Sequence, residues 1–115
     1  MSDIKDLTKK VIKFRDDRDW KQFHNPKDLS ISLALEAAEV LEHFQWKSPK
    51  EIEEYIKTNK GDLGDELADV LKYLLMIAHE LNIDLLKAVP EKMRKDAKKY
   101  PVEKSRGKHT KYNKL

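Results

Sequence analysis

The chain has 115 residues, of which 39% are charged and 39% hydrophobic, and its formal net charge is +3. A chain of this length buries only about two-thirds of the surface that its unfolded form exposes, so we expect a single domain over residues 1–115 that associates with copies of itself. The absence of cysteine excludes disulfides and thiolate metal sites and leaves carboxylates and four histidines as possible ligands. Hard cations that bind oxygen are therefore favoured.

No apolar segment approaches the roughly 18 residues that a membrane-spanning helix needs, and the N-terminus has no apolar signal core. We therefore expect a cytoplasmic protein without a membrane partner. Lys and Arg are concentrated from residue 87 onward, whereas Asp and Glu are concentrated in the middle of the chain. Two interpretations of the basic segment are open, a solvated arm or a phosphate-binding surface.

Apolar residues recur at helical spacing and no stretch alternates with a period of two, so the sequence predicts an all-α fold. The first helix is expected over residues 3–19, with Ser2 as its N-cap. Asn25 as N-cap and Pro26 at the first helical position predict a second helix that reaches about Trp46. The expected architecture is a bundle of antiparallel helices that is completed by oligomerisation.

Ser48 and Glu51 form a capping-box pattern, which predicts a short connecting helix that ends near Thr58. The next long helix is expected to begin between two glycines and to end near Asn82. Its apolar face comprises Leu67, Leu71, Leu74, Ala78 and Leu81.

The C-terminal region carries a possible N-cap, Asp84, followed by Pro90. Because proline is unfavourable deep inside a helix, we expect a turn over residues 84–88 and then a helix over residues 89–99. Residues 101–115 form a basic tail, to which no regular structure is assigned.

Two pairs of acids, Glu36 with Glu39 and Glu66 with Asp69, lie on the two longest predicted helices. Residues three apart share a helix face. Glu36 also interrupts an apolar stripe, where an ionised carboxylate without a partner would cost several kcal/mol. The second pair taken alone also fits a solvated face, but antiparallel packing of the two helices would bring the four carboxylates together. The sequence therefore predicts a metal site.

Carboxylate-only ligation suits Mg²⁺, with Mn²⁺ as a possible substitute, and these ions usually meet a phosphate-bearing substrate. No Glu is followed three residues later by His, as ferritin-like di-iron sites require. Neither the P-loop pattern nor the dinucleotide-binding glycine pattern occurs. Two metals between the four acids and a triphosphate would both neutralise the phosphates and activate a water for in-line attack.

The chain resembles the MazG-like, all-α nucleoside triphosphate pyrophosphohydrolases, and it is most similar to the single-domain members that include dCTP pyrophosphatases. Its two acid pairs match the metal motif of that family. Further matches are Arg18-Asp19-Trp20-Lys21-Gln22-Phe23-His24, Phe44-Gln45-Trp46-Lys47, Lys99-Tyr100-Pro101 and Lys111-Tyr112. The resemblance implies hydrolysis between the α- and β-phosphates, a purpose in nucleotide-pool housecleaning, and an enzyme built from dimers that is often tetrameric.

The resemblance also implies roles for individual residues. Four acids would bind magnesium: Glu36, Glu39, Glu66 and Asp69. One of them, Glu39, would also help to activate the attacking water. Four residues would line the base pocket: Trp20, Trp46, Phe23 and His24. For the tryptophans the alternative is a role as hydrophobic anchors at helix ends, and for His24 it is a role as a capping or surface residue.

Four more residues are candidate substrate contacts. Tyr73 lies one turn beyond the second acid pair, where its hydroxyl would reach a carboxylate or phosphate, or else sit at the rim of the core. Lys95 and Lys99 lie one turn apart and are candidate phosphate contacts. Asp96 departs from the asparagine of the family, and its effect is open between an added metal contact and weaker phosphate binding.

Two rival functions stay open at this point. The first is a non-catalytic helical oligomerisation or RNA-binding module, in which the acids form intersubunit salt bridges and the basic tail binds phosphates. The second is a metal-dependent phosphohydrolase that releases orthophosphate. The preferred base is not predicted, because stacking tryptophans accept any base.

Overall fold

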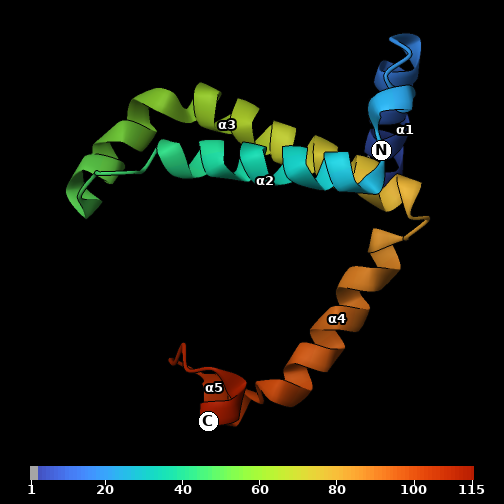
Figure 1. Cartoon of the computed structure of the whole chain (residues 1–115). Coiled ribbons are helices and arrows are strands. Elements are labelled where there is room, and N and C mark those ends of the chain that lie inside the picture. Colours follow the sequence, from blue (N-terminus) through green and yellow to red (C-terminus); the bar gives the residue numbers. More distant parts are fainter. Residues whose placement is uncertain (1–2) are drawn as a thin grey trace. The chain divides into compact units, whose positions relative to one another are not determined.

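The computed structural model describes residues 3–115, and within this range every regular element is a helix, as predicted. In chain order (Figure 1) the elements are α1 (Ile4–Asp17), the 3-10 helix η1 (Lys21–Phe23), α2 (Pro26–Glu42), α3 (Pro49–Glu80), α4 (Leu85–Lys99), α5 (Val102–Ser105) and the 3-10 helix η2 (Tyr112–Lys114). The chain divides into two compact units, one that ends at Asn82 and one over Ile83–Leu115. Among the described residues, no helix is long and apolar enough to cross a membrane.

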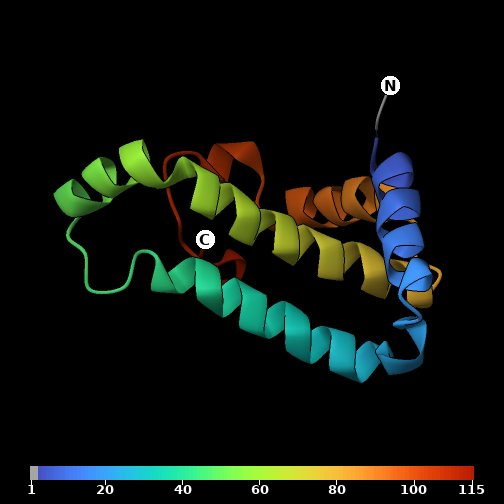
Figure 2. The ribbon, with the colours of Figure 1, turned by 90° about the horizontal axis from the view of Figure 1, so that it is seen from above.

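The first unit is built on the antiparallel pairing of α2 with α3, which lie side by side in Figures 1 and 2. Helix α1 packs against α3. Leu29 of α2 and Leu75 and Met76 of α3 are buried. Burial of each such side chain stabilises the folded chain by about 1.5–3 kcal/mol. Arg15 of α1 is also buried, and its Nη1 atom donates to Oε1 of Glu80 at 2.5 Å. This ion pair joins α1 to the end of α3.

The N-cap of α1 is Asp3, whose carboxylate accepts a hydrogen bond from the backbone N–H of Asp6 at 3.0 Å. Ser2, which the sequence analysis predicts for this role, lies outside the described residues. The helix ends at Asp17 and not at the predicted Asp19. The reason is local, because Asp19 has a φ of 54° in the left-handed region, where a right-handed helix cannot continue.

Helix α2 begins as predicted, with Asn25 accepting a hydrogen bond from the backbone N–H of Asp28 at 2.8 Å and a proline in the first turn. It ends at Glu42, before the predicted end near Trp46. Trp46 has a φ of 68°, so the backbone turns there toward α3. This turn puts the side chain of Trp46 in solvent, where it is 92% exposed.

The predicted capping box at the start of α3 is present: the N–H of Glu51 donates to Oγ of Ser48 at 3.2 Å, and the N–H of Ser48 donates to Oε1 of Glu51 at 3.1 Å. The predicted end of a short helix near Thr58 coincides with a break in α3, which spans 32 residues but consists of two helical segments that meet at a kink. Asn59 departs from helical geometry (φ −125°, ψ 21°), and its side chain donates to the carbonyl of Tyr55 at 2.9 Å. The first helical segment therefore ends at Asn59, and the second follows it directly without a loop.

The second unit begins with the predicted N-cap, since the Asp84 carboxylate accepts from the N–H of Leu86 at 3.0 Å. The predicted turn over residues 84–88 is wrong, because α4 starts directly after this cap and contains Pro90. Proline at this position removes one backbone hydrogen bond, the one that would reach the carbonyl of Leu86. The cap and the first turn are sufficient to start the helix ahead of the proline.

Residues 101–115 contain α5 and η2, so the prediction of no regular structure there is wrong. The ring of Tyr112 packs edge-on against that of Tyr100, with centroids 6.0 Å apart. The ammonium of Lys99 lies 4.7 Å from the centroid of the Tyr112 ring. These aromatic contacts hold the end of the chain against α4 within the second unit. A single domain over residues 1–115 stays a prediction.

Candidate metal centre

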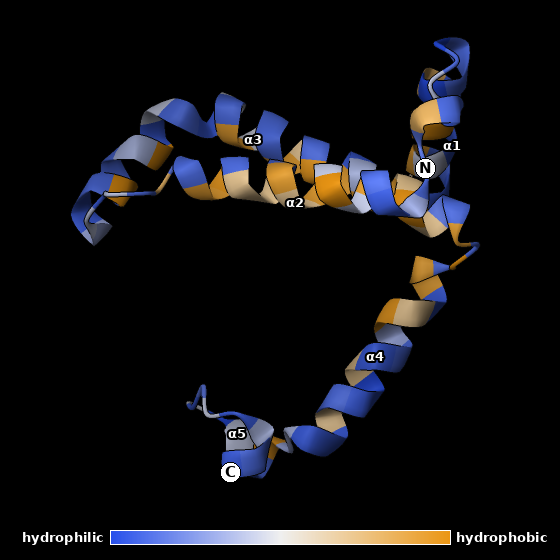
Figure 3. Ribbon diagram, in the orientation of Figure 1, coloured by the Kyte–Doolittle hydropathy of each residue, from blue (hydrophilic) through white to orange (hydrophobic). Residues whose placement is uncertain are grey.

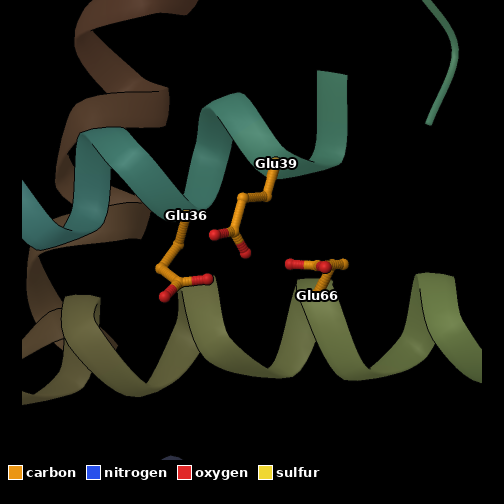
Figure 4. A group of neighbouring side chains, drawn as sticks. All are labelled: Glu36, Glu39 and Glu66. Carbon is orange, nitrogen blue, oxygen red and sulfur yellow. The ribbon is translucent and has the colours of Figure 1, made fainter. Parts of the chain in front are cut away.

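Three acids from α2 and α3 meet in the first unit, and we call Glu36, Glu39 and Glu66 the carboxylate trio. Figure 4 shows the two α2 side chains turned toward Glu66 of α3. Each residue offers one oxygen, and these oxygens lie within 4.8 Å of one another. The i,i+3 spacing puts the first two on one helix face, and the antiparallel pairing supplies the third. Glu36 and Glu66 are partly buried, whereas Glu39 is exposed.

Two oxygens of the carboxylate trio lack the partners that buried polar atoms normally have. Oε2 of Glu36 and Oε2 of Glu66 are buried and have no hydrogen-bond partner among residues 3–115. A buried acceptor that is left unpaired destabilises the fold, and the cost is larger when the acceptor is charged. A cation between the carboxylates would satisfy both oxygens. The trio therefore offers carboxylate oxygens and negative charge without a positive partner, which are the features of a site for a divalent cation.

The pKa values of the carboxylate trio reflect this crowding. Burial raises the pKa of Glu36, and hydrogen bonding to and repulsion from Glu39 raise it further. Hydrogen bonding to Glu39 raises the pKa of Glu66, followed by burial, while His43 acts in the opposite direction. Both shifts mean that the ionised forms are disfavoured without a positive partner. A divalent ion would reverse this effect.

Asp69, the fourth predicted ligand, follows Glu66 by about one turn of α3 but does not belong to the group of oxygens within 4.8 Å. Its Oδ1 atom lies 3.4 Å from Nζ of Lys72. The charge of Asp69 nevertheless contributes to the raised pKa of Glu36. The structure thus brings three of the four predicted ligands together, and a metal contact of Asp69 stays a prediction.

Three of the predicted substrate residues line one small cavity between α1 and α3, namely Trp20, His24 and Tyr73. The Trp20 ring packs edge-on against Phe14 with centroids 5.9 Å apart. Burial lowers the pKa of His24, with a further contribution from the positive charge of Arg15. Nδ1 of His24 is buried without a hydrogen-bond partner among the described residues.

The remaining predicted substrate residues lie elsewhere. Phe23 is 63% exposed and Trp46 is 92% exposed, and neither lines the cavity of Trp20. Lys95, Asp96 and Lys99 lie on α4 in the second unit. The carboxylate of Asp96 accepts from the ammonium of Lys92 within the same helix.

A polar hollow that was not predicted from the sequence lies beside the carboxylate trio and is lined by Glu39, Glu42, His43, Lys47, Tyr55 and Glu66. His43 contributes most to it, because its Nε2 atom lies 3.7 Å from Oε1 of Glu66. Its Nδ1 atom lies 2.5 Å from the hydroxyl of Tyr55. A signal existed in the sequence, because His43 follows Glu39 by four residues and so shares its face of α2.

Comparison with known proteins gives three kinds of match. Residues 31–115 match the MazG-like family. The dCTP pyrophosphatase 1 of Rattus norvegicus is 39% identical over 114 residues, which cover 97% of this chain and 67% of that protein. The human dCTP pyrophosphatase 1 is 35% identical over 114 residues, with the same coverage of 97% and 67%. A crystal structure of a pyrophosphatase from Archaeoglobus fulgidus has a TM-score of 0.82 and 40% identity, and the match covers 88% of this chain and 94% of that one.

Proposed function

The chain belongs to the MazG-like family, and we propose that it cleaves a nucleoside or deoxynucleoside triphosphate between the α- and β-phosphates with Mg²⁺ as its cofactor. The products are a nucleoside monophosphate and pyrophosphate. Similarity to dCTP pyrophosphatases over nearly the whole chain assigns it to the nucleoside triphosphate pyrophosphohydrolases and to nucleotide-pool housecleaning. The observation that carries the metal proposal is the carboxylate trio, with its two unpaired buried oxygens.

The carboxylate trio divides into two kinds of residue. Glu36 and Glu66 present their unpaired Oε2 atoms and would hold the cation. Bound Mg²⁺ supplies neutralisation of the phosphate charge and a more acidic water, and Mn²⁺ is expected to substitute for it. Glu39 would also bind the cation. Because it is exposed, it can reach a water in the site, and we propose that it accepts the proton of the attacking water. Asp69 would complete the ligand set.

For the base, we propose stacking on Trp46 and Trp20, with Phe23 and His24 as neighbours. The high exposure of Trp46 supports this role, because an anchor residue would be buried and a stacking platform must be open. Tyr73 shares the cavity of Trp20 and would contribute its hydroxyl.

For the phosphates, we propose contacts from α4. Lys95 and Lys99 would bind the triphosphate, and both side chains are exposed in the second unit. Asp96 already accepts from Lys92, which reduces its repulsion of a phosphate because its charge has a partner.

A homodimer, or a homotetramer built from dimers, is the form that we propose for the enzyme. Apolar side chains are exposed along α2, among them Ile31 (48%) and Leu35 (62%), and along α3, among them Leu67 (57%), Leu71 (36%) and Leu74 (39%). Figure 3 shows apolar residues along much of α2. Continuous apolar stripes on paired helices are typical of subunit interfaces, and a second copy would cover them. Location in the cytoplasm stays a prediction from the sequence.

The test is an assay of product identity. The chain is incubated with a panel of ribo- and deoxyribonucleoside triphosphates and Mg²⁺, and pyrophosphate and orthophosphate are measured separately. We expect pyrophosphate and the monophosphate from at least one triphosphate. Release of orthophosphate alone would support the rival phosphohydrolase instead.

Two Glu→Gln variants make the assay specific. Glu39→Gln should lower kcat by about 100-fold or more, as loss of a general base does. Glu54→Gln is the matched control and should keep full activity, because Glu54 is exposed on α3 and its one ion pair within residues 3–115 is with Lys57. If no triphosphate is cleaved and Glu39→Gln alters oligomerisation alone, the non-catalytic module is the better account.

A further inference from the structure

We propose that His43 and Tyr55 are positioning residues, which hold one carboxylate oxygen of Glu66 so that the other is presented to the cation. This inference rests on the proposed metal site. Neither residue belongs to the carboxylate trio, and neither is among the residues that the family resemblance marks. Both line the polar hollow beside the trio.

The imidazole of His43 bridges two parts of α3. His43 is the C-cap residue of α2, while Tyr55 lies before the kink of α3 at Asn59 and Glu66 lies after it. One ring nitrogen, Nδ1, meets the Tyr55 hydroxyl at 2.5 Å. The other, Nε2, lies 3.7 Å from Oε1 of Glu66. The ring therefore connects the two halves of α3 through a residue of α2.

The contact with Tyr55 favours the imidazole tautomer that carries its proton on Nε2, the nitrogen that faces Glu66. A phenol hydroxyl that donates to Nδ1 leaves the proton of the neutral ring on Nε2, and this atom faces Glu66. In this tautomer His43 offers an N–H to the carboxylate of Glu66. At 3.7 Å the contact is longer than a hydrogen bond, so it restrains Oε1 by electrostatic attraction. Outer partners of this kind orient the ligands of metal sites.

The two oxygens of Glu66 consequently have different surroundings. Oε1 faces His43, whereas Oε2 is buried and has no hydrogen-bond partner within the described part of the chain. Oε2 is thus left for the cation. An unrestrained carboxylate would lose rotational freedom on binding a metal, and this loss would weaken its affinity.

Tyr55 is itself held in place by several contacts. Its ring lies 4.4 Å from the ammonium of Lys47 and packs edge-on against Phe44 with centroids 6.4 Å apart. The Lys47 ammonium also donates to the backbone carbonyl of His43 at 2.6 Å. The turn after α2 and the first part of α3 therefore form one connected support for the imidazole.

The experiment measures binding of Mn²⁺ to the nucleotide-free full chain by electron paramagnetic resonance at fixed pH. His43→Leu keeps an apolar side chain of moderate size but removes the N–H, and we expect the Kd for Mn²⁺ to rise about 10-fold or more. His43→Gln retains an N–H donor and should recover most of this loss. If the ring only fills space, Leu should serve at least as well as Gln, and that result would overturn the proposal.

Tyr55→Phe keeps the packed ring and removes the hydroxyl, so it should raise the Kd several-fold and add little to the effect of His43→Leu. His79→Leu is the matched control, because His79 is exposed in the last turn of α3, and its Kd should equal that of the wild type. Circular dichroism checks the fold of each variant. If His43→Leu does not fold, the Kd of Tyr55→Phe for Mn²⁺ is the test, and a Kd equal to that of the wild type overturns the proposal.

Glu66→Gln separates this inference from the proposed function. If the wild type binds no Mn²⁺ at this site, so that Glu66→Gln changes nothing, the metal site itself is wrong. If Glu66→Gln abolishes binding while His43→Leu and Tyr55→Phe match the wild type, only the positioning role is wrong.

Discussion

Glu36 of α2 and Glu66 of α3 direct their carboxylates toward one another, with oxygens within 4.8 Å. Each also has one buried oxygen that lacks a hydrogen-bond partner in residues 3–115. Two like charges at this separation oppose the pairing of the helices that carry them, and a cation between them favours it. The stability of the first unit should therefore depend on metal binding.

Glu36→Gln tests this dependence. In EDTA the variant should melt at a higher temperature than the wild type, because it removes a carboxylate whose ionised form is disfavoured. Added Mg²⁺ should raise the melting temperature of the wild type and leave that of the variant unchanged, and the variant should lose most of its activity. Scanning fluorimetry in EDTA and in Mg²⁺ measures both effects. A lower melting temperature for Glu36→Gln in EDTA would mean that Glu36 already has a stabilising partner.

Trp46→Ala separates a stacking platform from a core anchor. Trp46 is 92% exposed, so its removal should leave the melting temperature unchanged. Loss of stacking should raise KM about 10-fold. Trp20→Ala is the comparison, and it should lower the melting temperature as well, because Trp20 packs on Phe14. An unchanged KM for Trp46→Ala would remove Trp46 from the site.

Leu71→Glu tests the subunit interface. Leu71 lies in the exposed apolar stripe of α3, and a charge there would be buried without a partner if a second copy covers the stripe. Light scattering after gel filtration should show a smaller assembly for Leu71→Glu than for the wild type. Thr58→Glu adds the same charge at an exposed position outside the stripe and should leave the assembly intact. A monomeric wild type would contradict the interface.

His24→Gln tests the effect of burial on His24. The pKa of His24 is lowered in the folded chain. Below pH 6.5, its ordinary pKa, the unfolded chain therefore binds the proton more readily than the folded chain, and the free energy of unfolding decreases as the pH is lowered. Urea unfolding at pH 7.5 and 5.5 should show a smaller loss for His24→Gln than for the wild type. The raised pKa values of Glu36 and Glu66 act with the opposite sign, and they cancel in the comparison. Equal losses would show that His24 titrates normally.

Local patterns in the sequence predicted the helix starts at Asn25 and Ser48, because an N-cap depends only on the residues of the first turn. Asp84 was predicted as an N-cap, but Pro90 led to an expected turn where α4 begins. The break near Thr58 was also predicted from local pattern, and Asn59 has non-helical φ and ψ. The sequence did not show that the second helical segment follows Asn59 without a loop, an arrangement that the pairing of α3 with α2 favours.

The carboxylate trio could be predicted because helical spacing and an acid within an apolar stripe are both visible in the sequence. The contact between His43 and Tyr55 could not be predicted, because it depends on where the turn after Glu42 places α3. The partner of Asp69 was also missed. Lys72 lies three residues later on the same helix, but a sequence does not decide between this lysine and a metal.

The most direct test of the account is a crystal structure of the chain with Mg²⁺ and a triphosphate analogue that cannot be cleaved between the α- and β-phosphates. We predict Mg²⁺ about 2.0–2.1 Å from carboxylate oxygens of Glu36 and Glu66, with Glu39 facing the α-phosphate. A nucleotide and metal bound elsewhere, with the carboxylate trio paired to Lys or Arg side chains of a second copy, would contradict it.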